Sequence, residues 1–198
     1  MALLTDLLNG LPASKFPKFN QPIWRARGWQ WIDPKKEVEA LMLLFESSFN
    51  DIAKDTRIHQ NKIKIKVIGA PEKLPKEVQD SIFRAEEKTK DYNNFHLNIA
   101  VAYSGRQEII HAVKKIVNEV LSGKIKPDQI DSSLLSSHLY TSDIPDPDLI
   151  LRTSGEERIS NFLLWQIAYA ELYFADVYWP ALRKIDFLRA IRSFQLRK

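Results

Sequence analysis

The spacing of apolar residues predicts a chain in which helices and strands alternate. From Pro34 onward, apolar side chains recur at intervals of three and four residues, which places them on one face of a helix. That face comprises Val38, Leu41, Met42, Phe45 and Phe49. Residues 62–69 instead alternate lysine with isoleucine before an apolar end, so we expect a strand that is exposed on one side for part of its length.

The rest of the chain continues this alternation. The further predicted elements are helices over 75–90, 105–121 and 128–140, strands over 95–103, 148–152 and 172–174, an apolar helix from about Asn161 and a final helix from about Asp186. The strand over 95–103 is mostly apolar, as expected where both faces are covered. The helix over 105–121 is expected to turn inward Ile109, Ile110, Val113, Ile116, Val117 and Val120.

This order of elements indicates an α/β fold, with a mostly parallel sheet flanked by helices. Ligands of such sheets bind beyond the carboxyl ends of the strands. The first 33 residues follow neither period, and Pro12, Pro17 and Pro22 exclude a continuous helix or a central strand there. We therefore predict an irregular N-terminal arm over 1–33 and a single α/β domain over 34–198.

Composition narrows the function classes. The chain has 198 residues, which is enough for one domain. It has no cysteine, which excludes disulfides, thiolate zinc sites and cysteine nucleophiles. The absence of cysteine also suits a reducing compartment. Its net charge is +4, with lysines spread along the chain, which argues against a nucleic-acid partner and is compatible with an anionic small molecule. No apolar stretch approaches the roughly 18–20 residues of a membrane span, and no secretory signal opens the chain, so we expect a cytoplasmic protein.

The residues with the most specific chemistry lie between Asp148 and Glu171. The strand over 148–152 brings Arg152 to its carboxyl end, a turn follows, and Arg158 and Ser160 are expected at the start of the next helix. Two guanidinium groups, a hydroxyl and free helix N–H groups fit a phosphate or diphosphate. Pairing of Arg152 with Glu156 or Glu157 is an equally weighted alternative on spacing alone.

The same segment resembles a known family. Arg152–Glu156, Arg158, Ser160–Gln166, Tyr169–Phe174 and Trp179-Pro180 are similar to the cis-prenyltransferases, most closely the bacterial undecaprenyl diphosphate synthases. Further matching residues are Leu97–Ala100, Tyr103–Arg106, Trp31, Pro34 and Glu37–Met42. The resemblance covers about Trp31 to Lys198.

This resemblance implies an activity and a set of binding residues. The activity is the condensation of isopentenyl diphosphate with an allylic diphosphate (farnesyl diphosphate or similar) to a polyprenyl diphosphate such as undecaprenyl diphosphate. Arg152, Arg158 and Ser160 would bind the diphosphate of isopentenyl diphosphate. Glu171 would help place Mg²⁺, from the neighbouring subunit's side of a dimer. From spacing alone, Glu171 is either a solvated helix end or a ligand of a hard cation.

The resemblance also implies a product tunnel and an assembly. Candidate wall residues are Met42, Phe45, Ile63, Ile65 and Phe95, for each of which an ordinary core position is the favoured alternative. The expected assembly is a homodimer, with a heterodimer as the alternative, and membrane contact is at most peripheral, through the lipid product.

The chain departs from the family pattern near its start. The family's Asp-Gly-Asn-Gly-Arg-Trp loop has no counterpart before Trp31, so the catalytic aspartate is not found and the first strand and helix of the family sheet are expected to be missing. A basic position of the family is occupied by Asp33, which should weaken anion binding. Three hypotheses follow: a condensing enzyme, a weak or inactive subunit or fragment that binds isopentenyl diphosphate and needs a complete partner, and an unrelated phosphate-binding α/β protein.

Overall fold

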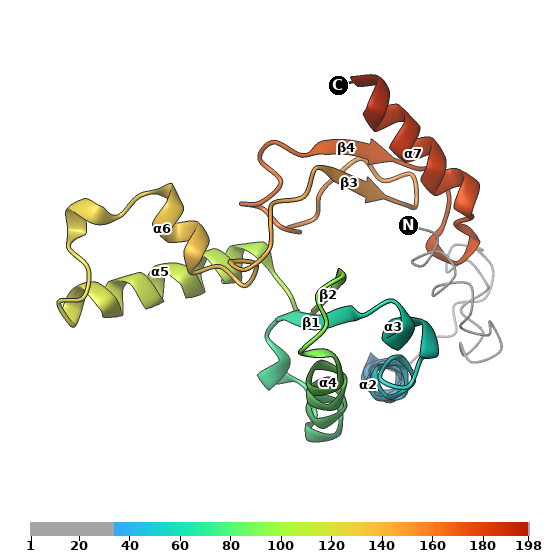
Figure 1. Ribbon diagram of the computed structural model, residues 1–198, viewed down its shortest axis with the longest axis horizontal. Helices are drawn as coiled ribbons and strands as arrows, with labels where there is room; N and C mark the ends of the chain where they lie inside the picture. Colours follow the sequence, from blue (N-terminus) through green and yellow to red (C-terminus); the bar gives the residue numbers. More distant parts are fainter. Residues whose placement is uncertain (1–33, 198) are drawn as a thin grey trace. The chain divides into compact units, whose positions relative to one another are not determined.

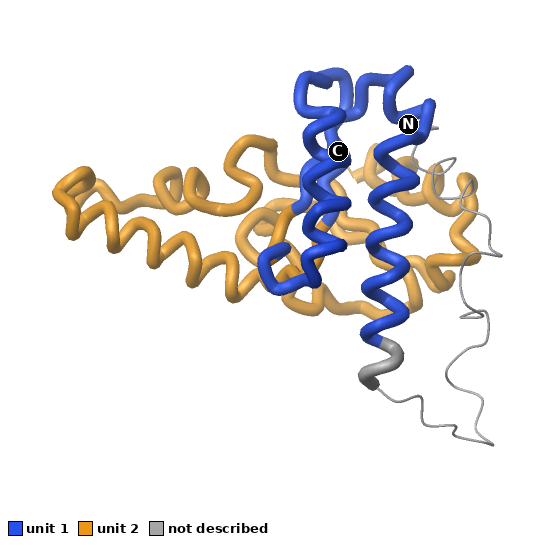
Figure 2. Tube along the Cα trace, turned by 90° about the horizontal axis from the view of Figure 1, so that it is seen from below, with its two compact units in different colours: residues 1–67, 71–99 blue, residues 68–70, 100–198 orange. Residues whose placement is uncertain are grey.

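The computed structural model describes residues 34–197, so the predicted arm over 1–33 and the Asp33 substitution lie outside the described part of the chain. Contacts divide the chain into two compact units (Figure 2). Among the described residues, one unit contains 34–67 and 71–99, and the other contains 68–70 and 100–197. The single domain over 34–198 stays a prediction.

The first unit combines packed helices with a strand pair (Figure 1). Its elements are α2 (Pro34–Ile52), α3 (Thr56–Gln60), β1 (Ile63–Gly69), the 3-10 turn η2 (Pro71–Lys73), α4 (Lys76–Thr89) and β2 (Phe95–Val101). The last two residues of each strand, 68–69 and 100–101, are assigned to the second unit. Helices α2 and α4 contact each other, and β1 is hydrogen-bonded to β2. Side chains of α4 also reach β1, since the Ile65 N–H donates to Thr89 Oγ1 (3.0 Å) and the Val67 N–H donates to Glu86 Oε1 (2.7 Å).

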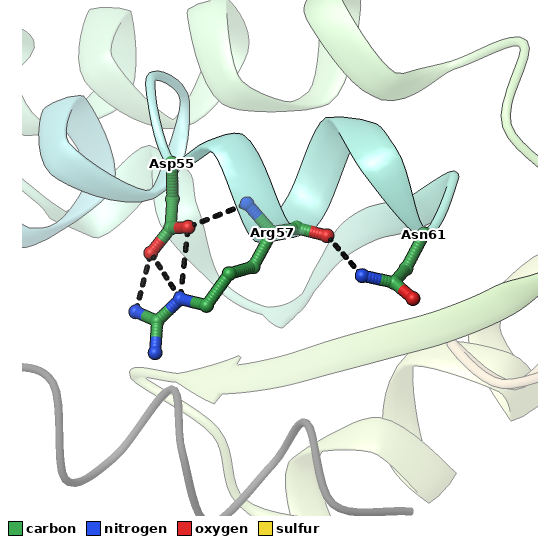
Figure 3. A network of polar contacts seen from close by, with 3 residues as sticks. All are labelled: Asp55, Arg57 and Asn61. Carbon is green, nitrogen blue, oxygen red and sulfur yellow. Dashed lines mark hydrogen bonds and ion pairs between the residues drawn. The ribbon is translucent and has the colours of Figure 1, made fainter.

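Helix α3 begins at a side-chain cap. Asp55 Oδ1 accepts a hydrogen bond from the Arg57 N–H (2.8 Å), and its carboxylate binds the Arg57 guanidinium, with 2.6 Å between Nη2 and Oδ2 (Figure 3). Asn61 Nδ2 donates to the Arg57 carbonyl at the other end of the helix (2.8 Å). These contacts satisfy backbone groups that a short helix leaves open at both ends.

The second unit contains a parallel strand pair and three α-helices in its described part. Its elements are α5 (Gly105–Leu121), η3 (Pro127–Gln129), α6 (Ser132–Ser137), β3 (Leu149–Arg152), β4 (Glu171–Phe174), η4 (Trp179–Ala181) and α7 (Lys184–Arg197). Strands β3 and β4 are parallel, α7 contacts β4, and α6 contacts α5 (Figure 1). The predicted α/β class with parallel strands and helices is confirmed.

One predicted helix is wrong. Residues 161–170 form turns instead of an α-helix. The reason lies in the backbone, because Ser160, Asn161 and Leu163 have φ of 46°, 63° and 45°, and left-handed residues cannot propagate a right-handed helix. Arg158 and Ser160 therefore do not precede a helix, and the expected helix N–H groups are not part of the anion site.

Two predictions about burial are also wrong. On α5, Ile116 is buried, but Ile110, Val113 and Val117 are 45%, 46% and 47% exposed, because α6 contacts only part of the helix. Strand β2 is exposed or half-buried apart from Val101, since β1 is its only partner strand in the described part of the chain. Among residues 34–197, no helix is both long enough and apolar enough to span a bilayer.

Candidate functional site: an arginine cluster at the end of strand β3

Arg152 is the centre of a polar cluster at the carboxyl end of β3. Its Nη1 donates to Ser160 Oγ (2.8 Å) and to the Arg158 carbonyl, and its Nη2 donates to Glu156 Oε2 (2.5 Å). Arg158 Nη2 lies 2.7 Å from the other oxygen of Glu156. The structure thus brings together the three predicted residues, and it also contains the Arg152–Glu156 pair that the sequence offered as the alternative.

The cluster carries an excess of positive charge. Arg152 and Arg158 contribute two positive charges and Glu156 one negative charge, which leaves one positive charge. The Arg158 side chain is 67% exposed, whereas that of Arg152 is 22% exposed and is held by its partners. The arrangement can bind a phosphate or diphosphate that displaces Glu156 from one or both guanidinium groups.

The turn after β3 is fixed by the chain that follows β4. The Ala175 N–H donates to the Arg152 carbonyl (2.8 Å), the Ser154 N–H to the Val177 carbonyl (2.8 Å), and the Gly155 N–H to the Ala175 carbonyl (3.1 Å). Gly155 has a φ of 66°, and a Cβ there would lie 2.8 Å from Asp176 Oδ1. Glycine is therefore favoured at this position, and the turn leads directly to Glu156.

A buried carboxylate lies within the same unit. Glu108 on α5 is 1% exposed; its Oε1 accepts from the Tyr140 N–H (2.8 Å), and its Oε2 accepts from the Tyr103 hydroxyl. Gln166 Nε2 donates to both Glu108 oxygens (3.2 and 3.1 Å) and to Thr141 Oγ1 (2.9 Å). Burial and the Glu108 carboxylate raise the pKa of Tyr103.

Sequence reasoning gave Glu108 no role. The only feature of the sequence that could have indicated a role is that Glu108 is an acidic residue within an otherwise apolar helical stripe. In the structure this residue ties α5 to the turns over 161–170, which follow the cluster.

Glu171 does not join the cluster within one chain. It is the first residue of β4, opposite Leu149, whereas Arg152 is opposite Phe174 at the other end of the pair, about 10 Å away along the strands. Its Oε2 accepts from Arg197 Nη1 (3.0 Å). Within one chain, Glu156 is the carboxylate that pairs with the two arginines, and the described residues contain no group of three or more acidic or histidine side chains that could hold a metal ion. They therefore do not form a magnesium site by themselves.

The candidate tunnel residues all belong to the first unit. Met42 and Phe45 on α2 are half-buried, Ile63 and Ile65 on β1 are buried in the core, and Phe95 at the start of β2 is 50% exposed. Their role as a tunnel wall stays a prediction.

Comparison with known proteins finds a matching family and relatives that share one name. Residues 30–198 match the family described as "Putative undecaprenyl diphosphate synthase". The chain is 56% identical over 167 residues to a tritrans,polycis-undecaprenyl-diphosphate synthase (geranylgeranyl-diphosphate specific) from Methanocaldococcus jannaschii, covering 83% of this chain and 60% of the relative. An equally named protein from Picrophilus torridus is 57% identical over 162 residues, covering 82% and 64%. The chain thus spans about three fifths of the length of these relatives.

A solved structure is similar as well. The crystal structure of lavandulyl diphosphate synthase from Lavandula x intermedia in complex with dimethylallyl diphosphate superposes with a TM-score of 0.76 at 35% identity, covering 83% of this chain and 70% of that one.

Proposed function

The chain belongs to the cis-prenyltransferase family, and on that premise we propose that it acts in cis-prenyl chain elongation and binds isopentenyl diphosphate at the Arg152 cluster. The observation that carries the proposal is the convergence of the Arg152 and Arg158 guanidinium groups and the Ser160 hydroxyl at one strand end. These groups suit a diphosphate, because a guanidinium binds two phosphate oxygens at once.

The reaction has a defined electron balance. The double bond of isopentenyl diphosphate attacks the allylic carbon, the carbon–oxygen bond to the allylic diphosphate breaks, and a proton leaves the new chain. Arg152, Arg158 and Ser160 hold the isopentenyl diphosphate and so fix the direction of its double bond. Glu156 keeps the two guanidinium groups in place until the substrate displaces it. Mg²⁺, when bound, would neutralise charge on the departing diphosphate.

The allylic substrate that we propose is geranylgeranyl diphosphate, ahead of the farnesyl diphosphate expected from the sequence. The support is the names of the relatives from Methanocaldococcus and Picrophilus, which specify geranylgeranyl diphosphate and undecaprenyl diphosphate. We further propose a homodimer, in which Glu171 of a second copy would supply a magnesium ligand.

The test is incorporation of labelled isopentenyl diphosphate by the full chain, with geranylgeranyl or farnesyl diphosphate as the primer, with Mg²⁺ or with a chelator. We expect magnesium-dependent polyprenyl product, and we expect Arg152→Ala to abolish binding of isopentenyl diphosphate. Arg183→Ala is the matched control, because Arg183 is an exposed arginine of the same unit that pairs with Asp186. Unchanged binding by Arg152→Ala would refute the site.

The alternative function is a subunit that needs a complete partner. It predicts measurable binding of isopentenyl diphosphate by the chain alone, no product, and product once a complete cis-prenyltransferase is added. Binding and turnover are therefore measured on the same preparation.

A further inference from the structure

The residue that follows Ser160 bridges the cluster to another helix. The Gly105 N–H donates to the Asn161 carbonyl (2.9 Å), and the Arg106 N–H donates to Asn161 Oδ1 (3.0 Å). In the opposite direction, Asn161 Nδ2 donates to Ser104 Oγ (2.8 Å), the hydroxyl that caps α5. Asn161 therefore exchanges three hydrogen bonds with three consecutive residues at the beginning of α5.

The approach of the two segments is close. A Cβ on Gly105 would lie 2.9 Å from Leu164 Cγ and 3.0 Å from the Asn161 carbonyl oxygen. Only a glycine leaves room for this backbone contact. The segment that follows Ser160 is thus seated directly on α5, with no intervening side chain from the helix.

The bridge acts on a backbone that needs support. Ser160 and Asn161 both have left-handed φ, of 46° and 63°, and consecutive non-glycine residues in this region are unfavourable unless their surroundings hold them. Asparagine tolerates this conformation better than most residues. The three bonds to α5 fix Asn161 and, through it, the direction in which Ser160 presents its hydroxyl to Arg152 Nη1.

We infer that Asn161 is a positioning residue, which holds the Ser160 hydroxyl and the Arg152 guanidinium ready for the diphosphate through its side-chain bridge to Ser104 and Arg106. This inference rests on the proposed function. Asn161 itself acts through Ser160 and need not touch the substrate. A preformed site binds more tightly because less order has to be imposed when the ligand arrives.

Two substitutions remove the bridge in different ways. Asn161→Gly keeps a residue that accepts left-handed φ and keeps the carbonyl bond from Gly105, but it deletes both side-chain bonds. Ser104→Ala deletes the acceptor of Asn161 Nδ2, whereas Ser104→Thr keeps a hydroxyl there. Asp131→Ala is the control for general destabilisation, because Asp131 caps α6 in the same unit with an equivalent bond to the Leu134 N–H (2.7 Å).

Equilibrium binding of labelled isopentenyl diphosphate to the full chain, its KM and kcat, and the thermal midpoint are measured for each variant. We expect Asn161→Gly and Ser104→Ala each to weaken binding and raise KM roughly fivefold, with kcat at saturation unchanged. In the double variant, the loss of binding should be smaller than the sum of the two single losses, because both changes remove the same hydrogen bond between Asn161 and Ser104. Ser104→Thr should retain binding, and Asp131→Ala should lower the thermal midpoint without weakening binding.

The inference is overturned if Asn161→Gly binds as tightly as the parent while Arg152→Ala does not bind, an outcome that leaves the proposed function intact. If Asn161→Gly fails to fold, the Ser104 pair decides, and equal affinities of the alanine and threonine variants overturn it. A parent chain that does not bind isopentenyl diphosphate refutes the proposed function and this inference together.

Discussion

At the scale of single residues, Asp55 combines a helix cap with an ion pair. Hydrogen bonds from the Arg57 side chain, ahead of its backbone N–H, hold the pKa of Asp55 below its ordinary value, despite an opposing effect of burial. The stability that results is present above the unfolded pKa of about 3.9 and is lost as the pH falls through the lower folded pKa. The contribution of the Asp55 carboxylate to folding stability should therefore be lost in acid.

Asp55→Ala should lower the free energy of unfolding by about 1 kcal/mol at neutral pH, the usual value of a side-chain cap. Asp55→Asn keeps a capping oxygen and loses only the charge, so its deficit should be smaller and should vanish in acid. Urea unfolding of the three chains at pH 7 and near pH 3 checks this. A deficit of Asp55→Asn that is the same at both pH values would contradict the assignment.

Tyr103 offers a second residue-scale test. Its pKa is raised, first by burial and then by its hydrogen bond to Glu108, so its hydroxyl should stay protonated beyond the ordinary value of about 10. Because the folded pKa is the higher one, this stability is complete below the unfolded pKa and is lost as the pH rises toward the folded value. Ultraviolet titration of phenolate should lack its most alkaline step in Tyr103→Phe, and an unchanged titration curve would rule out the buried pair.

At the scale of elements, two glycines with positive φ allow the cost of backbone strain to be compared with the cost of a steric clash. Gly69 ends β1 with a φ of 128°, and a Cβ there would lie 2.2 Å from the Val101 carbonyl oxygen of β2. Gly123 follows α5 with a φ of 74°, and a Cβ there would meet nothing within 4 Å. Gly123→Ala should cost about 1 kcal/mol from backbone strain alone.

Gly69→Ala should cost more than about 3 kcal/mol, because the β1–β2 pair must also separate. Chemical denaturation of both variants gives the comparison. Equal losses would mean that β2 moves aside without cost and that the contact does not define the end of the strand pair.

The sequence predicted elements best where a single period dominates. The helix over 105–121 and the strand over 62–69 agree with α5 and β1 because most of their apolar residues keep one spacing. The segment from Phe162 to Ala170 is apolar apart from Gln166, so its residue types do not reveal the left-handed backbone at Ser160 and Leu163. The chain direction there is set by docking on α5, which is a tertiary effect.

In the candidate site, too, local spacing predicts some features and only tertiary contacts explain the others. Arg152, Arg158 and Ser160 lie within one short segment, so local spacing was enough to predict that they meet. Asn161 and Glu108 act through partners more than 30 positions away, such as Ser104 and Tyr140, and only the fold reveals them. Glu171 is close in sequence but lies at the opposite end of the strand pair, which spacing alone does not predict.

At the scale of the whole molecule, the exposed stripe of α5 bears on the proposed homodimer. Ile110, Val113, Val117 and Leu121 recur at helical spacing, and each is at least 45% exposed. Covering four such side chains on each of two copies would contribute on the order of several kcal/mol, which must exceed the cost of association. A second copy is the occupant that we expect, as the homodimer proposal requires.

Val117→Asp places a charge in the middle of this stripe and should convert a dimer into a monomer in sedimentation equilibrium, because an unpaired charge is costly to bury. Leu43→Asp is the matched control, because Leu43 on α2 is 68% exposed and lies outside the stripe. The control should remain dimeric. If magnesium-dependent turnover relies on Glu171 of a second copy, the Val117→Asp monomer should lose turnover while retaining isopentenyl diphosphate binding at its own Arg152. A monomeric variant with full turnover would instead place the whole reaction within one chain.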